Sequence, residues 1–383
     1  MATSPSASSS SASSASGLHV PRALRQHVVQ NPFPGLARLE ATLGHPITHS
    51  LASNEALRLE GGELAAALVH ALGELSRRYP DPSATALRNR LSTGLGVEPE
   101  SLLVDAGADS LILLLLRSVT DAGMKVVVSA GTYPTFKYFA EGLGLDVIEV
   151  PYLDRAGART VDLQALVRAA HEHGAAVAYL ADPDNPTGTS FAEDDLLALA
   201  GQLPSSCLLM LDEAYADFTD IPRGARLAPN VARLRSFSKG HGLAGLRIGY
   251  ALVDTGLAAV ANQLRIHYAV SSLAQAAALH LIDTPFPAAL RRETLSLRED
   301  MARTFTAQGL DVFPSMTNFV AIRCRTPAIA AEVQARLWTL QVAVHRPAHP
   351  AMSDLLRITA HPRALAPEVL DVLRLASTGS DPV

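Results

Sequence analysis

A lysine flanked by hydroxyl groups, with an arginine further along, is the part of this sequence best suited to chemistry. The stretch reads Ser236-Phe237-Ser238-Lys239 and continues to Arg247. A lysine amine forms a Schiff base with an aldehyde, and serine hydroxyls and a guanidinium hydrogen-bond a phosphate dianion. Pyridoxal phosphate carries an aldehyde and a phosphate on one ring. The stretch therefore predicts a pyridoxal phosphate site with Lys239 as its Schiff-base residue.

The same stretch contains a glycine pattern that favours a different class of enzyme. Gly-x-Gly-x-x-Gly runs from Gly240 to Gly245 and matches the fingerprint of nicotinamide-dependent dehydrogenases. That fingerprint opens a helix after a strand and is followed about 20 positions later by an acidic residue. Val260 and Ala261 stand at that distance, and Asp254 comes too early. A dehydrogenase is the alternative from another class, and the lysine interpretation needs support elsewhere in the chain.

Further polar residues supply groups that pyridoxal phosphate chemistry requires. Asp212 ends the apolar run 208–211, where a buried carboxylate would keep the pyridine nitrogen protonated. Tyr215 and Asn185 are expected to donate to the phenolate oxygen of the cofactor, and Tyr133 to stack on its ring. Asn185 and Tyr133 lie among prolines and glycines, so an ordinary loop is the alternative for both.

Small residues at a predicted helix start are suited to hold the phosphate. Gly107, Ala108 and Asp109 directly precede the apolar helix expected from Ser110. Free backbone N–H groups and the helix dipole both attract an anion at such a position. A plain N-cap by Asp109 is the alternative.

The bulk composition limits the classes of partner. Of 383 residues, 48% are hydrophobic and 18% charged, and the formal net charge is −5. This balance offers no footprint for nucleic acid or an anionic membrane, so small-molecule partners are expected. No apolar run is long enough to span a membrane, and no metal-ligand spacing occurs.

Cysteine usage and the N-terminal composition bear on location. Cys207 and Cys324 lie in apolar segments, as expected for two buried thiols in a reducing compartment, and we expect a cytoplasmic protein. The stretch 1–17 is mostly Ser and Ala without basic residues, which is unlike a signal peptide and typical of a disordered tail.

The apolar pattern predicts a doubly wound α/β domain with a mostly parallel sheet. From about 83 to 264, short β-like runs alternate with helical stretches, as in parallel strands joined by helical crossovers. The expected strands are 125–128, 147–150, 176–180, 208–211, 231–234 and 248–253, and the expected helices include 110–120, 135–143, 163–173 and 193–203. Tyr133, Asn185, Asp212 and Lys239 each follow one of these strands. They should therefore converge at the carboxyl edge of the sheet.

Beyond residue 265 the pattern changes to that of a smaller α+β domain. Its expected helices are 273–282 and 287–308, and its expected strands are 318–323, 342–345 and 355–359. The predicted organisation is a disordered tail over 1–17, an arm over 18–54 packing on the small domain, a large pyridoxal-phosphate-binding domain over 55–265 and a small C-terminal domain over 266–383.

Together these stretches resemble a known family. From about Phe33 to the last helix, the chain is similar to the fold-type I pyridoxal-phosphate-dependent aminotransferases of class I and II, most closely the histidinol-phosphate aminotransferase group. The matching stretches are Ser53-Asn54-Glu55, Arg78-Tyr79-Pro80-Asp81-Pro82, Gly107-Ala108-Asp109, Thr132-Tyr133-Pro134, Asn185-Pro186-Thr187-Gly188-Thr189, Asp212-Glu213-Ala214-Tyr215, the stretch 236–250, the stretch 270–275, Asn318-Phe319-Val320 and Leu356-Arg357-Ile358-Thr359.

The resemblance implies roles for the candidate site residues. It makes Lys239 the Schiff-base lysine and proton shuttle of a ping-pong transamination between an amino donor and a keto acid. The cofactor contacts it implies are Asp212 at the pyridine nitrogen, Tyr215 and Asn185 at the phenolate oxygen, Tyr133 on the ring, and Gly107, Ala108, Asp109, Ser236, Ser238 and Arg247 around the phosphate. Tyr79 would reach the cofactor phosphate of a neighbouring subunit, which implies a homodimer with shared active sites.

The substrate side departs from the family pattern. The resemblance gives Arg357 the anionic end of the substrate and places Asn54 beside it. His345 stands where members acting on histidinol phosphate carry a second arginine, with Arg346 next to it, and Phe33 stands where a tyrosine is frequent. The pair Gly240-His241 also replaces the usual Ala-Phe. An α-amino acid with an aromatic or imidazole side chain fits this pattern, and histidinol phosphate stays open as a substrate if Arg346 turns inward. Decarboxylation, racemisation and chemistry at Cβ stay open as reactions.

Overall fold

The computed structural model describes residues 20–378, except 22–23, 25–28, 30, 34, 59–61, 156 and 227. The tail predicted over 1–17 lies outside the described residues, as does much of the predicted arm before residue 35. No helix of the described ranges is both long and apolar enough to cross a membrane.

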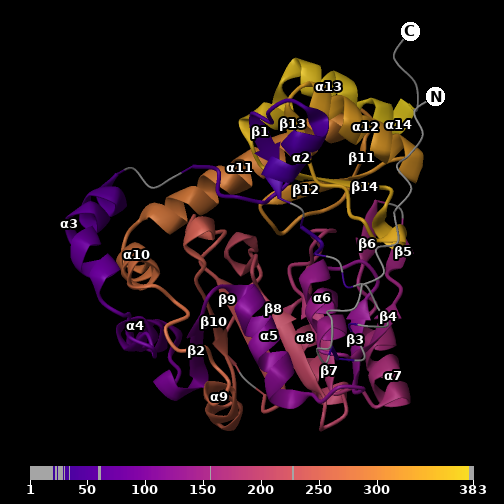
Figure 1. The fold of residues 1–383 in the computed structure, drawn as a ribbon. Helices are drawn as coiled ribbons and strands as arrows, with labels where there is room; N and C mark the ends of the chain where they lie inside the picture. Colours follow the sequence, from indigo (N-terminus) through magenta and orange to yellow (C-terminus); the bar gives the residue numbers. More distant parts are fainter. Residues whose placement is uncertain are drawn as a thin grey trace.

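A seven-stranded sheet forms the centre of the larger part of the molecule (Figure 1). Its strands lie in the order β2-β10-β9-β8-β7-β3-β4. Their bounds are β2 (Leu102–Asp105), β3 (Lys125–Ser129), β4 (Asp146–Val150), β7 (Val177–Ala181), β8 (Leu208–Asp212), β9 (Val231–Ser236) and β10 (Gly249–Leu252). The predicted α/β fold class with a mostly parallel sheet is confirmed.

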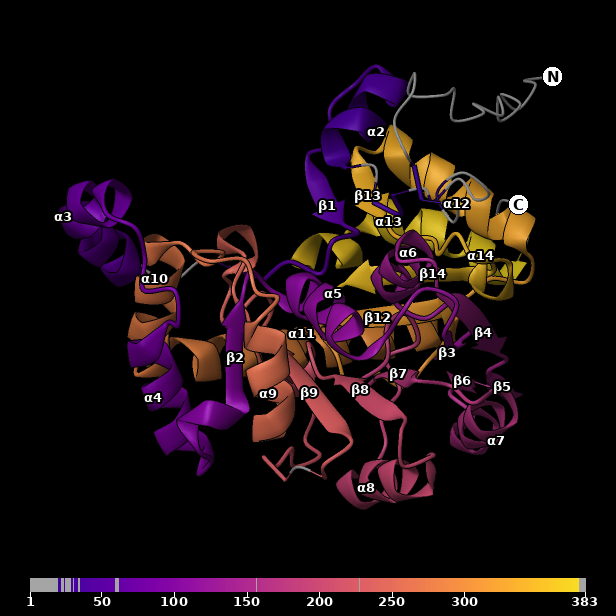
Figure 2. The same ribbon diagram turned by 60° about the horizontal axis from the view of Figure 1, so that its bottom comes forward.

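Helices cover both faces of this sheet (Figure 2). Side chains alternate along each strand, so Tyr179 and Met210 pack toward one set of helices while Leu180 and Leu211 pack toward the other. The first set is α5 (Ala108–Val119), α6 (Pro134–Gly142) and α9 (Thr255–Asn262), and the second is α7 (Leu163–His173) and α8 (Glu193–Gln202). Asp212 and Ser236 continue the alternation on the face that α5 covers.

One strand runs against the parallel prediction. The segment expected as a strand over 248–253 is β10, and it pairs antiparallel with both β9 and β2. A parallel neighbour of β9 would need a crossover long enough to hold a helix. Residues 237–248 contain only the short 3-10 helix Ala244–Leu246, so the chain turns back beside β9. Pattern reading also missed β2, the edge strand next to β10.

A smaller sheet lies in the C-terminal part of the chain. It comprises β11 (Asp311–Val312), β12 (Phe319–Arg323) and β14 (Leu355–Thr359), and an isolated bridge from His345 to Arg357 connects it to β13 (Val342–Val344). β1 (His49–Leu51) pairs parallel with β13, so the entry strand lies against this part. The covering helices are α2 (Leu36–Leu43), α11 (Phe286–Ala307), α12 (Pro327–Thr339), α13 (Pro367–Leu373) and α14 (Leu375–Thr378).

The helix α10 (Ser272–Ile282) packs with the large sheet rather than with the small one. Ala274, Ala277 and Leu281 share a core with Val104 and Leu252, next to α3 (Glu63–Arg77) and α4 (Thr85–Leu95). α11 then runs from this region to the small sheet (Figure 1). We therefore propose the two-domain division with its boundary at α11 instead of residue 265.

Candidate active site

Lys239 lies in the loop after β9, and its partly buried side chain extends toward Ser53 and Tyr215. Its Nζ donates to the carbonyl of Ser53 at 3.0 Å and lies 6.0 Å from the ring centroid of Tyr215. Burial, and then the charges of Arg357 and Arg247, lower the pKa of Lys239 to about 8. The amine is therefore much closer to its uncharged, nucleophilic form than an exposed lysine.

Asp212 occupies the carboxyl end of β8 on the same face of the sheet. Its side chain is buried and accepts hydrogen bonds from the Tyr179 hydroxyl at 2.7 Å and the Ala214 amide at 3.0 Å. Burial raises the pKa of Asp212 to about 6, although these two donors favour the charged carboxylate. No cation bonds this carboxylate within the described ranges, so a protonated ring nitrogen would find an unpaired charge there.

A network of polar side chains connects the two sheets above the lysine. The Tyr215 hydroxyl accepts from Asn54 Nδ2 at 2.7 Å, and Asn54 Oδ1 accepts from the Thr359 hydroxyl at 3.0 Å. Arg357 donates from Nη1 to Asn185 Oδ1 at 2.6 Å and from Nη2 to the Ala52 carbonyl.

Arg357 and Lys239 lie close to each other, because they donate to the adjacent carbonyls of Ala52 and Ser53. Of the described residues, several have a buried side-chain donor without a partner, and Nε of Arg357 is one of these donors. A buried guanidinium with a spare donor suits an anionic ligand.

The helix start at α5 forms a cradle with the right chemistry for a phosphate. Gly107 has φ 85°, which lets the chain turn into the helix, and a Cβ there would lie 2.8 Å from Arg247 Nη2. Arg247 donates to Ser238 Oγ at 3.4 Å and lies 3.6 Å from Asp109, while the Ser236 hydroxyl accepts from the Ser238 amide at 3.0 Å. The guanidinium is half exposed, so its charge is accessible to a ligand.

The aromatic residues predicted around the cofactor lie in two places. Tyr133 packs beside the cradle, since its hydroxyl donates to Asp109 at 2.9 Å, and Phe33 contacts its ring at a centroid distance of 5.9 Å. Tyr79 is 83% exposed and stacks on Tyr268.

The two substrate candidates next to Arg357 diverge. Arg346 donates from Nε to Gln334 on α12 at 3.3 Å, so its guanidinium is directed to that helix. The partly buried His345 pairs through its backbone with Arg357. Burial and the charges of Arg357 and Arg346 lower the pKa of His345 well below its usual value, so the ring is neutral.

Comparisons with known proteins agree with this geometry. The family model for aminotransferase class I and II matches residues 48–373. The chain belongs to this family. A histidinol-phosphate aminotransferase of Lactiplantibacillus plantarum is 34% identical over 306 residues, which are 78% of this chain and 83% of that protein. One of Anaeromyxobacter is 36% identical over 302 residues, 76% of this chain and 80% of that protein.

A solved structure gives the same result in three dimensions. Histidinol-phosphate aminotransferase from Sinorhizobium meliloti, in complex with pyridoxal phosphate, matches with a TM-score of 0.82 and 32% identity, covering 92% of this chain and 95% of that one. The predicted aminotransferase with a pyridoxal phosphate cofactor is confirmed at the level of the family. The dehydrogenase alternative is wrong, since the glycine pattern lies between two antiparallel strands and opens no α-helix.

Sequence reasoning missed two positioning groups of this aminotransferase. Tyr179 was expected only as part of an apolar strand, yet a buried tyrosine hydroxyl needs a partner, and Asp212 is within reach along that face. Asp184 accepts from the hydroxyls of Thr132, Tyr152 and Thr187 at 2.7 to 3.1 Å and thereby holds the loop that carries Asn185. Burial raises the pKa of Asp184.

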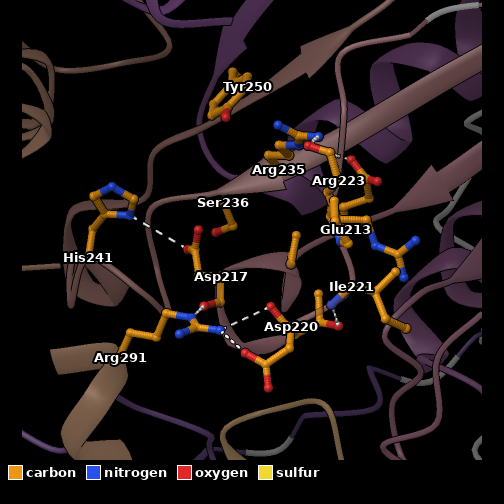
Figure 3. A pocket seen from close by; sticks show the side chains of 13 residues that line it. Glu213, Asp217, Asp220, Ile221, Arg223, Arg235, Ser236, His241, Tyr250 and Arg291 are labelled. Carbon is orange, nitrogen blue, oxygen red and sulfur yellow. Dashed lines mark hydrogen bonds and ion pairs between the residues drawn. The ribbon is translucent and has the colours of Figure 1, made fainter. Parts of the chain in front are cut away.

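A polar pocket of about 340 Å³ lies beside the lysine loop, and Lys239, Asp212 and Arg357 are not among its described lining residues (Figure 3). Arg235 donates to Glu213 at 2.9 Å, and Arg291 donates to Asp220 at 2.5 Å. His241 faces Asp217 at 3.7 Å. Because the described arginines here are paired with carboxylates, whereas no carboxylate of the described residues bonds Arg357, the surroundings of Lys239 are the better site for an anionic ligand.

Proposed function

We propose that the protein is a pyridoxal-phosphate-dependent aminotransferase whose amino donor is histidinol phosphate and whose acceptor is a keto acid. The observation that carries the proposal is Arg357, a buried guanidinium that lies close to Lys239 and has a spare donor at Nε. The names of the relatives more than 30% identical support the same substrate.

The residues around Lys239 fit the cofactor. Lys239 would hold its aldehyde carbon, the cradle at Gly107 and Arg247 its phosphate, and Asp212 its ring nitrogen. Tyr215 accepts its hydrogen bond from Asn54, so its own proton is available for the phenolate oxygen. When bound, the cofactor supplies a conjugated ring that accepts the electron pair released at the substrate Cα.

Lys239 would act as the general base and acid that moves the proton of the substrate Cα. Once the amine of Lys239 is free, its pKa of about 8 leaves part of it uncharged near neutral pH. It takes the proton from the substrate Cα and returns it to the cofactor C4′, the two halves of a general base and acid role. Asp212 would hold a protonated ring nitrogen, because an unpaired carboxylate in that buried position would be costly.

Arg357 is the group that would select the phosphate. Its fork of donors matches a phosphate oxygen pair, and no carboxylate bonds it within the described ranges. Arg346, the other arginine considered for the phosphate, donates to Gln334. We therefore do not expect Arg346 to assist Arg357. We expect phosphate recognition by one arginine, with His345 contributing a neutral ring.

The test is a half-reaction with purified holoenzyme and no acceptor. Histidinol phosphate should convert the aldehyde absorbance of the cofactor to that of the amine, and a keto acid should restore it. Histidinol, which lacks the phosphate, is the matched control, and we expect at least about tenfold weaker half-saturation because a charge-assisted hydrogen bond contributes about 1.5–3 kcal/mol. Preference for an aromatic amino acid would overturn the substrate, and carbon dioxide or an inverted amino acid as product would overturn transamination.

The lysine composition makes the anchor easy to verify. Lys125, Lys137 and Lys239 are the lysines of the chain. Borohydride should bleach the holoenzyme and fix cofactor mass to the peptide of Lys239 alone, with the other two peptides as internal controls. Label on Lys125 or Lys137 would contradict the assignment.

We further propose a homodimer in which Tyr79 completes the partner's site. Tyr79, Val69 and Ile266 expose 83%, 69% and 68% of their surface near α3, an apolar region suited to a second copy. Mixing Lys239→Ala subunits with Tyr79→Ala subunits should restore activity, because the hybrid holds one intact site. Absence of any recovery after subunit exchange would contradict sharing. A cytoplasmic location is supported by the two buried free thiols, Cys207 and Cys324.

A further inference from the structure

A small hairpin reaches from the large sheet to the small one. It consists of β5 (Leu153–Arg155) and β6 (Ala158–Thr160), which pair antiparallel, and it follows the edge strand β4. Figure 1 shows the hairpin next to β4 and β14. None of the roles assigned above uses it.

Arg159 of the hairpin forms an ion pair and hydrogen bonds with the segment before β14. Its guanidinium makes two parallel contacts with Asp354, Nη1–Oδ1 at 2.9 Å and Nη2–Oδ2 at 3.1 Å. Nη1 also donates to the Ala351 carbonyl at 2.9 Å, and Nη2 to Asp154 at 2.9 Å. The side chain is only 9% exposed, so water and salt screen these contacts weakly.

A second arginine extends the cluster from the other side. Arg323, the last residue of β12, donates to Asp154 at 2.9 Å and to the Arg155 carbonyl at 2.9 Å. Its Nε lies 3.0 Å from Asp311. We call these residues the hairpin clasp: Asp154, Arg159, Asp311, Arg323 and Asp354.

The clasp lies at the start of β14, the strand that carries Arg357. Asp354 directly precedes β14, and Leu355 pairs with Arg323 in the sheet register. Arg357 follows on the same strand, where its own backbone bonds His345. β14 pairs with β12 along its whole length, but its other edge is bonded only through the bridge between Arg357 and His345. A shift at Asp354 is therefore carried along the strand to Arg357.

We propose that Arg159 is a positioning residue for Arg357, which it acts on through Asp354 and β14. This inference rests on the proposed function, since it assumes that Arg357 holds the phosphate of the amino donor. Arg357 bonds Asn185 and Ala52 of other segments, so its guanidinium is correctly placed only when β14 has one fixed position. A displacement of about 1 Å in a binding group costs on the order of 10²-fold in efficiency.

The test compares full-length holoenzyme variants at a temperature well below unfolding. Arg159→Gln removes the guanidinium of the clasp, and Asp354→Asn removes the carboxylate charge that faces it at nearly constant volume. We expect KM for histidinol phosphate to rise about 10- to 100-fold, kcat to stay within about threefold, and turnover of histidinol to change less than twofold. Arg159→Lys keeps the charge but loses the two parallel donors, so its KM for histidinol phosphate should lie between those of wild type and Arg159→Gln.

A matched control and a second readout separate positioning from general stability. Arg363→Gln breaks the ion pair with Glu368 in the same part of the molecule and should leave KM unchanged. Hydrogen exchange of the amides 355–357 should quicken about tenfold in both clasp variants but not in this control. Unchanged exchange and unchanged KM in the folded clasp variants would overturn the inference. If wild type ignores histidinol phosphate, the proposed function fails, while the exchange result still supports or overturns the clasp.

Discussion

The residues proposed to hold the cofactor and the arginine proposed to hold the substrate are positioned in different ways. On the proposed cofactor side, Asp212 ends β8 and Lys239 lies in the loop after β9. Asp212 is bonded by Ala214 and by Tyr179 of the adjacent strand, whereas Lys239 donates to the distant Ser53. On the substrate side, Arg357 lies within β14 and depends on Asn185, Ala52 and the hairpin clasp, which come from distant parts of the chain. The placement of Asp212 and Lys239 thus follows from the strand ends of the large sheet, whereas that of Arg357 depends on contacts between distant segments.

The largest expected effect is on the cofactor side, at the anchor itself. Lys239→Ala removes both the covalent attachment and the base, so kcat should fall at least about 10³-fold while cofactor still binds noncovalently. Single-turnover spectroscopy with histidinol phosphate measures it. Lys137→Ala, which removes a surface ion pair with Glu149, is the control. Turnover by Lys239→Ala at more than about a tenth of the wild-type rate would contradict the role.

The next effect concerns the pyridine partner. Asp212→Asn removes the charge that would face the ring nitrogen, and loss of one charged hydrogen bond of about 1.5–3 kcal/mol predicts about a 10- to 150-fold fall in kcat. Tyr179→Phe removes only a donor to that carboxylate. It should cost about 2- to 10-fold and raise the pKa of Asp212 above about 6, seen as a shifted acid limb of the pH–rate profile. An equal loss in both variants would contradict this order.

This difference in construction also explains what the sequence predicted. Strand ends are readable from apolar runs, and polar residues at the carboxyl ends of parallel strands meet at one edge, so Asp212 and Lys239 could be placed in advance. The direction of β10 depended on the absence of a helix in 237–248, which apolar periodicity does not register. Tyr179, Asp184 and the partner of Arg346 depend on which side chains meet across elements. That information lies in packing, not in spacing.

A third prediction couples the two sides through charge. Arg357 is the largest charge effect that lowers the pKa of Lys239. The rate at which apoenzyme recovers cofactor follows the uncharged amine, so it should rise with pH up to about 8 and then level off. Arg357→Gln should move this midpoint upward, and Arg346→Gln should not. If the midpoint of this pH dependence is the same in Arg357→Gln as in wild type, the charge of Arg357 does not lower the pKa of Lys239.

A fourth prediction uses the neutral ring of His345. Its pKa is lowered in the folded protein by burial and by Arg357 and Arg346. Below about pH 6.5 the unfolded chain binds a proton that the folded chain does not, so stability should fall as the pH drops. His345→Gln should remove this part of the dependence, measured as Tm between pH 5 and 8. A profile identical to wild type would mean that the ring titrates normally.

The smallest expected effect is at Arg346. Because its Nε is bonded to Gln334 on α12, Arg346→Ala should change KM for histidinol phosphate less than about twofold, whereas Arg357→Gln should raise it about 10- to 150-fold. Steady-state assays of both variants give the contrast. A tenfold rise in Arg346→Ala would place that guanidinium in the substrate site.

The residue after the anchor lysine restricts how this loop can change over evolution. A Cβ at Gly240 would lie 2.2 Å from Asp217 Oδ2 and 2.6 Å from its Cβ, so even alanine has no room. Truncating Asp217 to alanine would keep the second clash, and only a glycine there or a moved backbone would relieve it. A lineage with a larger residue at 240 must therefore have altered position 217 or the path of its loop first, which fixes the order of the two substitutions.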